Sequence, residues 1–507
     1  MNHNNELPLV TDTILSFDNI TIRNFNKVIF EKLNFALKAG EHWAIVGRSG
    51  SGKSVFLDAL AGKTSFPSGV AAYPAFDEYI KASESDDPLF NRFKLISQVS
   101  SRHRFTNLSN TTDLYYQQRF NSMDSEDSPT VEQYLSEVKS YNTGGYWSFE
   151  RSVTRLNLEP LLDKQLIKLS NGETKRLMLA AALIRNPILL LLDNPLTGLD
   201  ISARADFNGL LHEIKSSGIS IIMATSPGEV PDAITHVAVL GIGKIEEQLP
   251  RDLFKHEEYK ALSPDLDTPE LESLLSISEA PDYQVIVGMK DVTIKYGDKT
   301  ILENLNWEIT QGERWMLCGP NGAGKSTLLS LINGDNPQAF ANNIILFDKK
   351  KGGGESIWEI KKKIGFVSPE LFQYFPMESS CMHVIESGFY DTLGLFRRSN
   401  EDKASICLRW MHLLQIDTFA GSLFKNVSVS VQRLCLLARA LIKNPPLLIF
   451  DEPCQGMDQE QQERFQYLVD EICKRSKVSL IYVSHYEAEK PNSVTRVLRL
   501  DNGREAR

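Results

Sequence analysis

The sequence predicts an α/β protein made of two similar domains, each built around a mostly parallel sheet, and three observations support this. The chain has 507 residues, which is too long for one hydrophobic core. A block of sequence from the first half returns in the second half. Within each half, short apolar runs typical of buried strands alternate with helical patterns, and this alternation favours parallel strands covered by helices.

The returning block is evidence of an internal duplication. The segment that starts at Ile20 reads ITIRNFNKVIFEKLNFALKAGEHWAIVGRSGSGKS, and it aligns without a gap with VTIKYGDKTILENLNWEITQGERWMLCGPNGAGKS, which starts at Val292. A repeat at this distance indicates duplicated domains, because solenoid repeats are no longer than about 50 residues. We place the domains at 1–250 and 284–507, joined by an acidic linker with several prolines at 251–283.

The composition is that of a globular protein without a membrane anchor: 42% of residues are hydrophobic and 24% are charged. No apolar run reaches the roughly 20 residues of a membrane-spanning helix, and the first residues lack the pattern of a secretory signal. The six cysteines form no CxxC pair, which fits reduced thiols. The net charge of −10 counts against binding nucleic acid by phosphate neutralisation. We expect a cytoplasmic protein.

Each half contains a glycine-rich loop of the form GxxxxGK[ST], at residues 47–54 and 319–326. Glycines allow backbone N–H groups to face phosphate oxygens, and the next helix directs its positive end at the same anion. The lysine would contact the β- and γ-phosphates, and the serine would bind Mg²⁺. A glycine turn without a ligand is the alternative, but two such loops in equivalent places argue against it. The residues expected to bind the nucleotide are Gly47, Gly50, Gly52, Lys53, Ser54, Gly319, Gly322, Gly324, Lys325, Ser326 and Thr327.

Both halves also contain an apolar strand that ends in an aspartate, LLLLDNPLTGLD at 189–200 and LLIFDEPCQGMD at 447–458. In the second copy Asp451 is followed by a carboxylate, Glu452. In the first copy Asp193 is followed by an amide, Asn194. An amide, unlike a carboxylate, cannot accept a proton, so the two copies differ in their acid–base chemistry at this position.

These motifs resemble those of the ATP-binding cassette (ABC) superfamily over almost the whole chain. The resemblance implies two tandem P-loop nucleotide-binding domains, each with an antiparallel β part and a helical subdomain, and ATP and Mg²⁺ as cofactors. It implies that Asp193 and Asp451 hold the magnesium shell and that Glu452 polarises the attacking water. It assigns three further roles: His485 in IYVSH as the switch histidine, Tyr296 as the aromatic that stacks on adenine, and Gln98 in LISQVS as the Q-loop glutamine that senses magnesium.

The LSGGQ signature of the family corresponds to Leu169-Ser170-Asn171-Gly172-Glu173. From the residues alone, Ser170 and Glu173 predict a capping box that opens a helix, and a helix start with Gly172 at its tip can also bind an anion. The resemblance implies that Ser170 and Gly172 take part in catalysis by meeting the γ-phosphate across the interface of an intramolecular head-to-tail pseudo-dimer.

That geometry implies two composite sites, of which the site with Lys325 and Glu452 has nearly every expected part. The other site departs from the family at several positions. They are Asn194 in place of the catalytic glutamate, Thr225 or Ser226 in place of the switch histidine, Asn24 (with Phe25 beside it) in place of the stacking aromatic, and the facing signature Val427-Ser428-Val429-Ser430-Val431. We therefore expect this site to bind ATP and to turn it over slowly or not at all.

One position of the second half also departs from the family, since FVSPE places Pro369 and Glu370 where the Q-loop glutamine stands. Glu370 could substitute for the glutamine, or the coupling partner could be unusual, and the sequence does not decide between these alternatives.

The layout of the whole chain resembles the ModF/PhrA-type soluble tandem ABC proteins, which are associated with molybdate transport or photorepair. This implies a monomeric ATPase that serves a separate partner, such as a membrane permease at the inner face of the cell membrane. A nucleotide-gated switch or scaffold with little turnover is the alternative. An F-type ABC translation factor fits less well, because the linker is short and one catalytic glutamate is absent. The aromatic stretch LYYQQRF at 114–120 could form a partner surface, although ordinary helix packing is the simpler interpretation.

Overall fold

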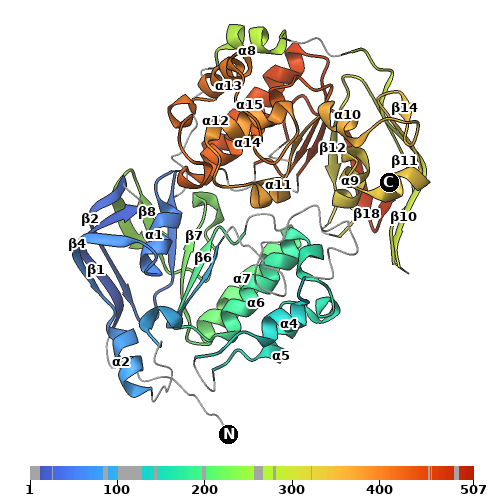
Figure 1. Cartoon of the computed structure of the whole chain (residues 1–507). Coiled ribbons are helices and arrows are strands. Elements are labelled where there is room, and N and C mark those ends of the chain that lie inside the picture. Colours follow the sequence, from blue (N-terminus) through green and yellow to red (C-terminus); the bar gives the residue numbers. More distant parts are fainter. Residues whose placement is uncertain are drawn as a thin grey trace. The chain divides into compact units, whose positions relative to one another are not determined.

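The computed structural model describes most of the chain in two compact units, residues 12–255 and 266–506 (Figure 1). The described residues are 12–24, 27–48, 50–83, 90–100, 128–141, 145–196, 201–255, 266–277, 281–297, 299–320, 322–454, 457, 459–484 and 490–506. We call these units the first and the second domain.

The first domain contains a six-stranded sheet in the order β5-β6-β7-β3-β8-β9, parallel except between β8 and β9, and an antiparallel sheet in the order β2-β1-β4. The strands are β1 (Thr13–Asn24), β2 (Lys27–Lys38), β3 (Trp43–Gly47), β4 (Ser65–Ala72), β5 (Ile96–Val99), β6 (Leu189–Asp193), β7 (Ser220–Ala224), β8 (His236–Leu240) and β9 (Ile245–Pro250). The α-helices are α1 (Lys53–Leu60), α2 (Pro74–Ala82), α4 (Val131–Ser136), α5 (Phe149–Arg155), α6 (Asn171–Ile184) and α7 (Ile201–Ser216). The 3-10 helices are η1 (Arg92–Leu95), η3 (Glu159–Leu161), η4 (Leu166–Lys168), η5 (Pro227–Glu229) and η6 (Arg251–Leu253).

The second domain repeats this plan, with a six-stranded sheet in the order β15-β16-β17-β12-β18-β19 and an antiparallel sheet in the order β11-β10-β13-β14. The strands are β10 (Val285–Tyr296), β11 (Lys299–Thr310), β12 (Arg314–Cys318), β13 (Asn343–Leu346), β14 (Lys349–Lys350), β15 (Ile364–Val367), β16 (Leu447–Asp451), β17 (Ser479–Val483), β18 (Arg496–Asp501) and β19 (Arg504–Glu505). The α-helices are α8 (Thr268–Leu275), α9 (Lys325–Asn333), α10 (Ile357–Lys362), α11 (Pro369–Tyr374), α12 (Cys381–Glu386), α13 (Glu401–Leu413), α14 (Val429–Leu441) and α15 (Gln459–Arg475). The 3-10 helices are η7 (Pro337–Ala341), η8 (Ser387–Phe389), η9 (Asp417–Phe419) and η10 (Phe424–Asn426).

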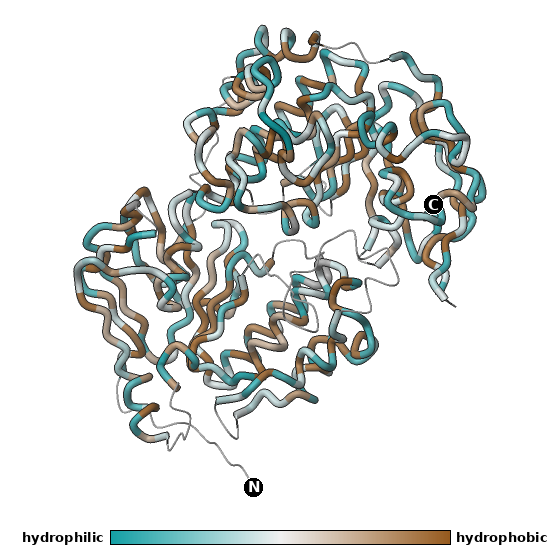
Figure 2. The backbone as a smooth tube through the Cα atoms, viewed as in Figure 1, coloured by the Kyte–Doolittle hydropathy of each residue, from teal (hydrophilic) through white to brown (hydrophobic). Residues whose placement is uncertain are grey.

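The central strands are apolar on both faces because each face meets its own hydrophobic cluster. In β6, Leu190 and Leu192 belong to one cluster, whereas Leu189 and Leu191 belong to the other. Successive residues of a strand point to opposite faces, so a strand covered on both sides loses the alternation of polar and apolar residues. Figure 2 shows the apolar residues concentrated along these strands in both domains.

The position of the site follows from the strand order. β3 lies between β7 and β8, and β12 lies between β17 and β18, so each glycine-rich loop leaves the middle of its sheet. Because the strands are parallel, their carboxyl ends meet at one edge, which is where ligands bind in open α/β sheets.

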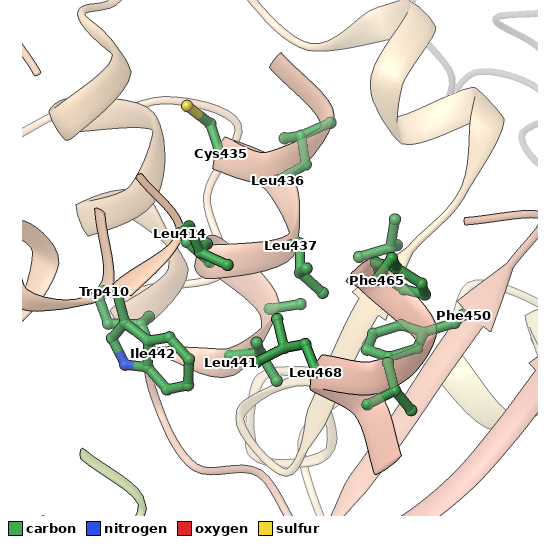
Figure 3. Packing of buried hydrophobic residues seen from close by; sticks show 14 of the residues in the cluster. Trp410, Leu414, Cys435, Leu436, Leu437, Leu441, Ile442, Phe450, Phe465 and Leu468 are labelled. Atoms are coloured by element: carbon green, nitrogen blue, oxygen red, sulfur yellow. The ribbon is translucent and has the colours of Figure 1, made fainter. Parts of the chain in front are cut away.

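Figure 3 shows how α14 is fixed inside the second domain. Its residues Leu437 and Leu441 belong to the same buried cluster as Trp410 of α13 and Phe450 of β16. The rings of Phe450 and Phe465 lie with their centroids 5.7 Å apart. Burying a large apolar side chain contributes about 1.5–3 kcal/mol. This packing holds α14 in place relative to β16.

Helix α8 belongs to the second domain, although it lies inside the segment expected to be a linker. Leu271 and Leu274 are fully buried, and α8 lies beside α13 (Figure 1). The guanidinium of Arg409 donates to both carboxylate oxygens of Glu270, at 2.7 and 3.0 Å. The Asn444 amide donates to the Leu274 carbonyl at 2.9 Å.

In the described part of the chain, no helix is both long enough and apolar enough to cross a membrane.

His42 makes the stability of the first domain depend on pH. Its side chain is buried, and its Nδ1 accepts a hydrogen bond from the Ile221 N–H at 3.3 Å. Burial first, and then the positive charge of Lys215, lowers the pKa of His42 to about 4. The native state therefore binds fewer protons than the unfolded state. The stabilisation is fully present above the unfolded pKa of 6.5 and is lost as the pH falls from there towards 4.

We expect the free energy of unfolding of this domain to fall by about 3 kcal/mol between pH 7 and pH 4 through His42. Hydrogen exchange of peptides that contain β3 and β7 would measure the change. His42→Gln keeps an acceptor without titrating in this range, so its loss should be smaller. An equal loss in the variant would show that other groups cause the effect.

Candidate functional site

The two glycine-rich loops have the same shape. In the first domain, the Lys53 ammonium donates to the carbonyl oxygens of Gly47 at 2.6 Å and Arg48 at 3.1 Å. In the second domain, the Lys325 ammonium donates to those of Gly319 at 2.7 Å and Pro320 at 3.1 Å. Each lysine thus lies across its own loop, with its charge where phosphates would be bound.

Glycine is required at two points of each loop. A Cβ on Gly47 or Gly319 would collide with the carbonyl oxygen of Leu240 or Leu500 in the neighbouring strand. Gly52 and Gly324 have φ angles of 95° and 100°, in the left-handed region, and they are the N-cap residues of α1 and α9. Both helices therefore begin with backbone N–H groups directed into the loop, the arrangement that binds phosphate. The remaining predicted residues follow the same geometry: Gly50 and Gly322 have left-handed φ angles, and Ser54, Ser326 and Thr327 lie in the first turn of the helices.

An acidic residue ends the adjacent strand in each domain. Asp193 is buried, and burial raises the pKa of its carboxyl group, an effect that a hydrogen bond with Ser54 partly offsets. In the second domain, removal from water raises the pKa of Asp451 well above its ordinary value, and the charges of Glu370 and Glu452 raise it further. The nearby Lys325 acts in the opposite direction.

These oxygen atoms fit a magnesium ion that arrives with a nucleotide. In the part of the chain that the structure describes, no three His, Cys, Asp or Glu side chains form a ready-made metal site. Mg²⁺ usually takes one or two carboxylates together with water and substrate phosphates. Ser54 with Asp193, and Ser326 with Asp451, supply such a partial set of ligands.

Asn194 and Glu452 occupy the same backbone position in their domains. Their φ angles are 48° and 46°, in the left-handed region, and their N–H groups donate to Ala224 at 2.9 Å and to Val483 at 3.0 Å. Asparagine adopts this conformation readily, whereas for most other residues it costs roughly 1–2 kcal/mol. Backbone strain of this kind is typical of functional sites, and here the strained residue is Glu452, which carries the carboxylate.

The helix start at 170–173 has the predicted capping box. The Glu173 N–H donates to the Ser170 hydroxyl at 3.3 Å, and the Ser170 N–H donates to the Glu173 carboxylate at 2.7 Å. This prediction is confirmed. At the equivalent start of α14, the Ser428 hydroxyl accepts from the Val431 N–H at 3.4 Å, and valine cannot make the return bond.

The structure places Gln98 and Glu370 differently. Gln98 lies inside β5, opposite Leu191, and by this register it matches Phe366 of β15, which lies opposite Ile449. Its amide donates to the Asp58 carboxylate at 2.9 Å. The positions of the first domain that match Pro369 and Glu370 by register lie outside the described residues. The magnesium role of Gln98 stays a prediction.

Glu370 follows β15 at the start of α11, and it is 9% exposed. It lies close enough to Asp451 to raise the pKa of that carboxyl group. Of the two alternatives that the sequence left open, this geometry favours the substitution of the glutamine by Glu370.

The residues expected near the adenine ring of ATP lie at the ends of equivalent hairpin strands. Tyr296 ends β10 and pairs with Lys299, and Asn24 ends β1 and pairs with Lys27. Tyr296 is 47% exposed, and its hydroxyl accepts a hydrogen bond from the Asn336 amide at 2.9 Å.

At the position of the switch histidine in the first domain, Thr225 is buried, and its N–H donates to the Ile45 carbonyl at 3.1 Å. The expectations for His485, Phe25 and the stretch 114–120 concern residues outside the described part of the chain.

Comparison with known proteins identifies the family. Residues 30–197 and 302–455 match the family model described as ABC transporter. The chain belongs to this family. It is 33% identical over 471 residues to the ABC transporter ATP-binding protein ModF of Escherichia coli (strain K12), with 91% of each chain covered. It is 31% identical over 502 residues to an ABC transporter ATP-binding protein of Schizosaccharomyces pombe, covering 97% of this chain and 99% of that protein.

Among solved structures, a model of ribosome-bound archaeal Pelota and ABCE1 matches with a TM-score of 0.59 at 17% identity, covering 98% of this chain and 78% of that chain. At this identity the match shows the fold alone. The protein is therefore a tandem ABC protein with two α/β nucleotide-binding domains, and domains of this family generally bind ATP with Mg²⁺ and hydrolyse it.

Each domain also places a basic side chain near its acidic strand, and the ABC motifs did not identify these two residues. Arg433 of α14 is buried, with its guanidinium 4.3 Å from the centre of the Phe372 ring. Burial lowers its pKa to about 10, and the charge of Glu452 acts against that shift. In the first domain, the charge of Lys175 from α6 lowers the pKa of Asp193. The sequence signal that could have identified these two residues is a basic residue five positions after Ser170 and five positions after Ser428.

The backbone conformation at Glu452 predicts a stabilising substitution. Glu452→Asn should raise the free energy of unfolding of the second domain by about 1 kcal/mol beyond Glu452→Gln, because both variants remove the charge but only asparagine suits the left-handed conformation. Differential scanning calorimetry without nucleotide would measure the difference. Equal stability of the two variants would contradict the strain at this residue.

Proposed function

We propose that the chain is an ATPase in which the second domain hydrolyses ATP, whereas the first domain binds ATP and turns it over slowly or not at all. One observation carries the proposal: a single backbone position holds the carboxylate Glu452 in one domain and the amide Asn194 in the other. The phosphate loops beside them have the same shape, so at this position the two sites differ in chemistry and not in backbone geometry.

In the proposed reaction, the second loop holds the triphosphate by its backbone N–H groups and by Lys325, which moves from the loop carbonyls to the phosphates. Ser326 and Asp451 would hold Mg²⁺, with Glu370 next to Asp451, and the ion would supply positive charge to the β- and γ-phosphates. Glu452 accepts a hydrogen bond from water and directs its oxygen at the γ-phosphorus. Phosphoryl transfer depends mainly on positioning and on charge stabilisation, which these groups provide.

In the first domain, Asn194 already donates to the Asp193 carboxylate at 3.1 Å. An amide can orient water but cannot take its proton, and general-base assistance contributes about 10²–10⁴-fold. Two further roles follow the family resemblance and remain predictions: Ser170 and Gly172 at the capped start of α6 would contact the γ-phosphate of the ATP held by the second loop, and His485 would act as the switch histidine.

The similarity to a protein named ABC transporter ATP-binding protein ModF supports a role in energising a separate partner. We propose a membrane permease as that partner, which would bring the protein to the inner face of the cell membrane. A nucleotide-gated switch would differ from such an ATPase by a single burst of phosphate release without sustained turnover.

The proposal predicts unequal effects of two matched substitutions. Glu452→Gln should lower the steady-state rate of ATP hydrolysis by about 10²-fold or more, because it removes the base. Asn194→Gln should leave most of the rate. Phosphate release by the purified protein in Mg-ATP, over many turnovers and in the first turnover, would measure both. Equal losses from the two changes would overturn the division of labour, and a single burst in the unmodified protein would favour the switch.

A further inference from the structure

Asn336 holds the hydroxyl of Tyr296 in the second domain. It is 1% exposed, and its amide nitrogen donates both to the Tyr296 hydroxyl at 2.9 Å and to the Ser330 hydroxyl at 3.2 Å. Its amide oxygen accepts from the Gln338 N–H at 3.0 Å. Since the rest of the Tyr296 side chain is half exposed, this bond at the ring's far end restricts a ring that could otherwise rotate.

The segment after α9 also holds the backbone of the strand that ends at Tyr296. The Gln338 side chain accepts from the Lys295 N–H at 3.3 Å and donates to the Lys295 carbonyl at 2.8 Å. The Asn342 side chain accepts from the Thr293 N–H at 3.0 Å. Strand β13 pairs with β10 along Val287–Lys290. The side chains of Asn336, Gln338 and Asn342, which we call the amide clamp, thus continue the edge of β10 as far as Tyr296.

The amide clamp connects Tyr296 to the phosphate loop. Ser330, which shares the Asn336 amide, lies in α9, the helix that starts at Lys325. In the hairpin formed by β10 and β11, Leu302 of β11 lies against Gly324. A Cβ added to Gly324 would come within 2.8 Å of the leucine side chain. The ring is therefore fixed relative to the groups that would hold the phosphates.

The first domain is built differently at the same place. The gapless alignment matches Tyr296 with Asn24, and continued without a gap past Ser54 it matches Ser330 with Asp58 and Asn336 with Thr64. The edge of β1 pairs there with β4, at Thr21 with Ser68 and at Arg23 with Ser65. Within the described residues, the enclosed Thr64 hydroxyl makes no hydrogen bond.

We propose that Asn336 is a positioning residue for ATP in the second domain, where it fixes the Tyr296 ring in the orientation in which adenine stacks. This rests on the proposed function, in which the second domain binds ATP, and on the expectation from the family resemblance that adenine stacks on Tyr296. A ring that is ordered before binding loses less conformational entropy when the base arrives, so the affinity is higher. Because the base lies far from the γ-phosphate, the clamp contributes equally to the ground state and the transition state, and it acts on KM and not on kcat.

A double-mutant cycle on the full chain tests the proposal. Tyr296→Phe keeps the ring and removes the hydroxyl, and Asn336→Ala removes the donor. Each should raise the KM for ATP by about 3- to 10-fold, the cost of immobilising one free side chain on binding, with kcat unchanged. The double variant should match the single variants, because both remove the same bond. Additive increases in KM, or a loss of kcat, would overturn the proposal.

Matched controls separate positioning from a structural role. Asn336→Asp should restore the KM to within about twofold, since a carboxylate accepts a hydrogen bond from the Tyr296 hydroxyl and keeps the acceptor for Gln338, while the Ser330 hydroxyl still donates to the Thr327 carbonyl at 2.7 Å. Thr64→Ala, the equivalent change in the first domain, should leave the KM unchanged. Inorganic triphosphate has no base, so its inhibition constant should be the same in all variants. A rise in that constant in step with the KM would show damage to the phosphate loop and would overturn the proposal.

A binding measurement distinguishes this proposal from the proposed function. If the chain does not hydrolyse ATP, photolabelling with 8-azido-ATP still reports the base site through the peptide that contains Tyr296. Half-maximal labelling should then require about 3- to 10-fold more probe in Tyr296→Phe and Asn336→Ala. Unchanged labelling in both variants would contradict the clamp whatever the activity of the chain.

Discussion

In both domains the residue after the acidic strand is held in the left-handed conformation by a hydrogen bond from its N–H to the neighbouring strand. This backbone constraint brings the side chain to the carboxyl edge of the sheet, beside the aspartate and the phosphate loop. The sheet imposes it, so it persists whether the residue is Glu452 or Asn194. The duplicated domains therefore share a common frame in which one substitution changes the chemistry and leaves the fold intact.

The charged groups near the aspartate that ends the acidic strand differ between the two domains. In the second domain Asp451 lies near two more carboxylates, Glu370 and Glu452, and the positive charge comes from Lys325 and from the buried Arg433. In the first domain Asp193 lies near Asp58, Lys53 and Lys175. A concentration of negative charge that requires cations to balance it suits a site that handles Mg²⁺ and triphosphate in a reaction cycle. The first site, with an amide next to its aspartate, has less of this charge to balance.

Much of the fold and of the site could be predicted from the sequence, because each motif joins a strand, a loop and a helix in a fixed order. The glycine loops, the acidic strands and the capping box at Ser170 depend on local spacing. The place of Gln98 depends on strand register, which LISQVS alone does not fix, and β5 begins early enough to put the glutamine inside the strand. The partner of Tyr296 could not be found either, because Asn336 lies forty residues away and belongs to no motif.

Helix α8 shows that the second folded domain begins before the second copy of the sequence repeat. The duplicated pattern resumes after it, yet Leu271, Leu274 and Glu270 complete the surface of α13 and α15. A polypeptide that began where the repeat begins would leave an apolar groove open to water and Arg409 without its carboxylate. The second domain therefore depends on residues that lie outside the repeated sequence.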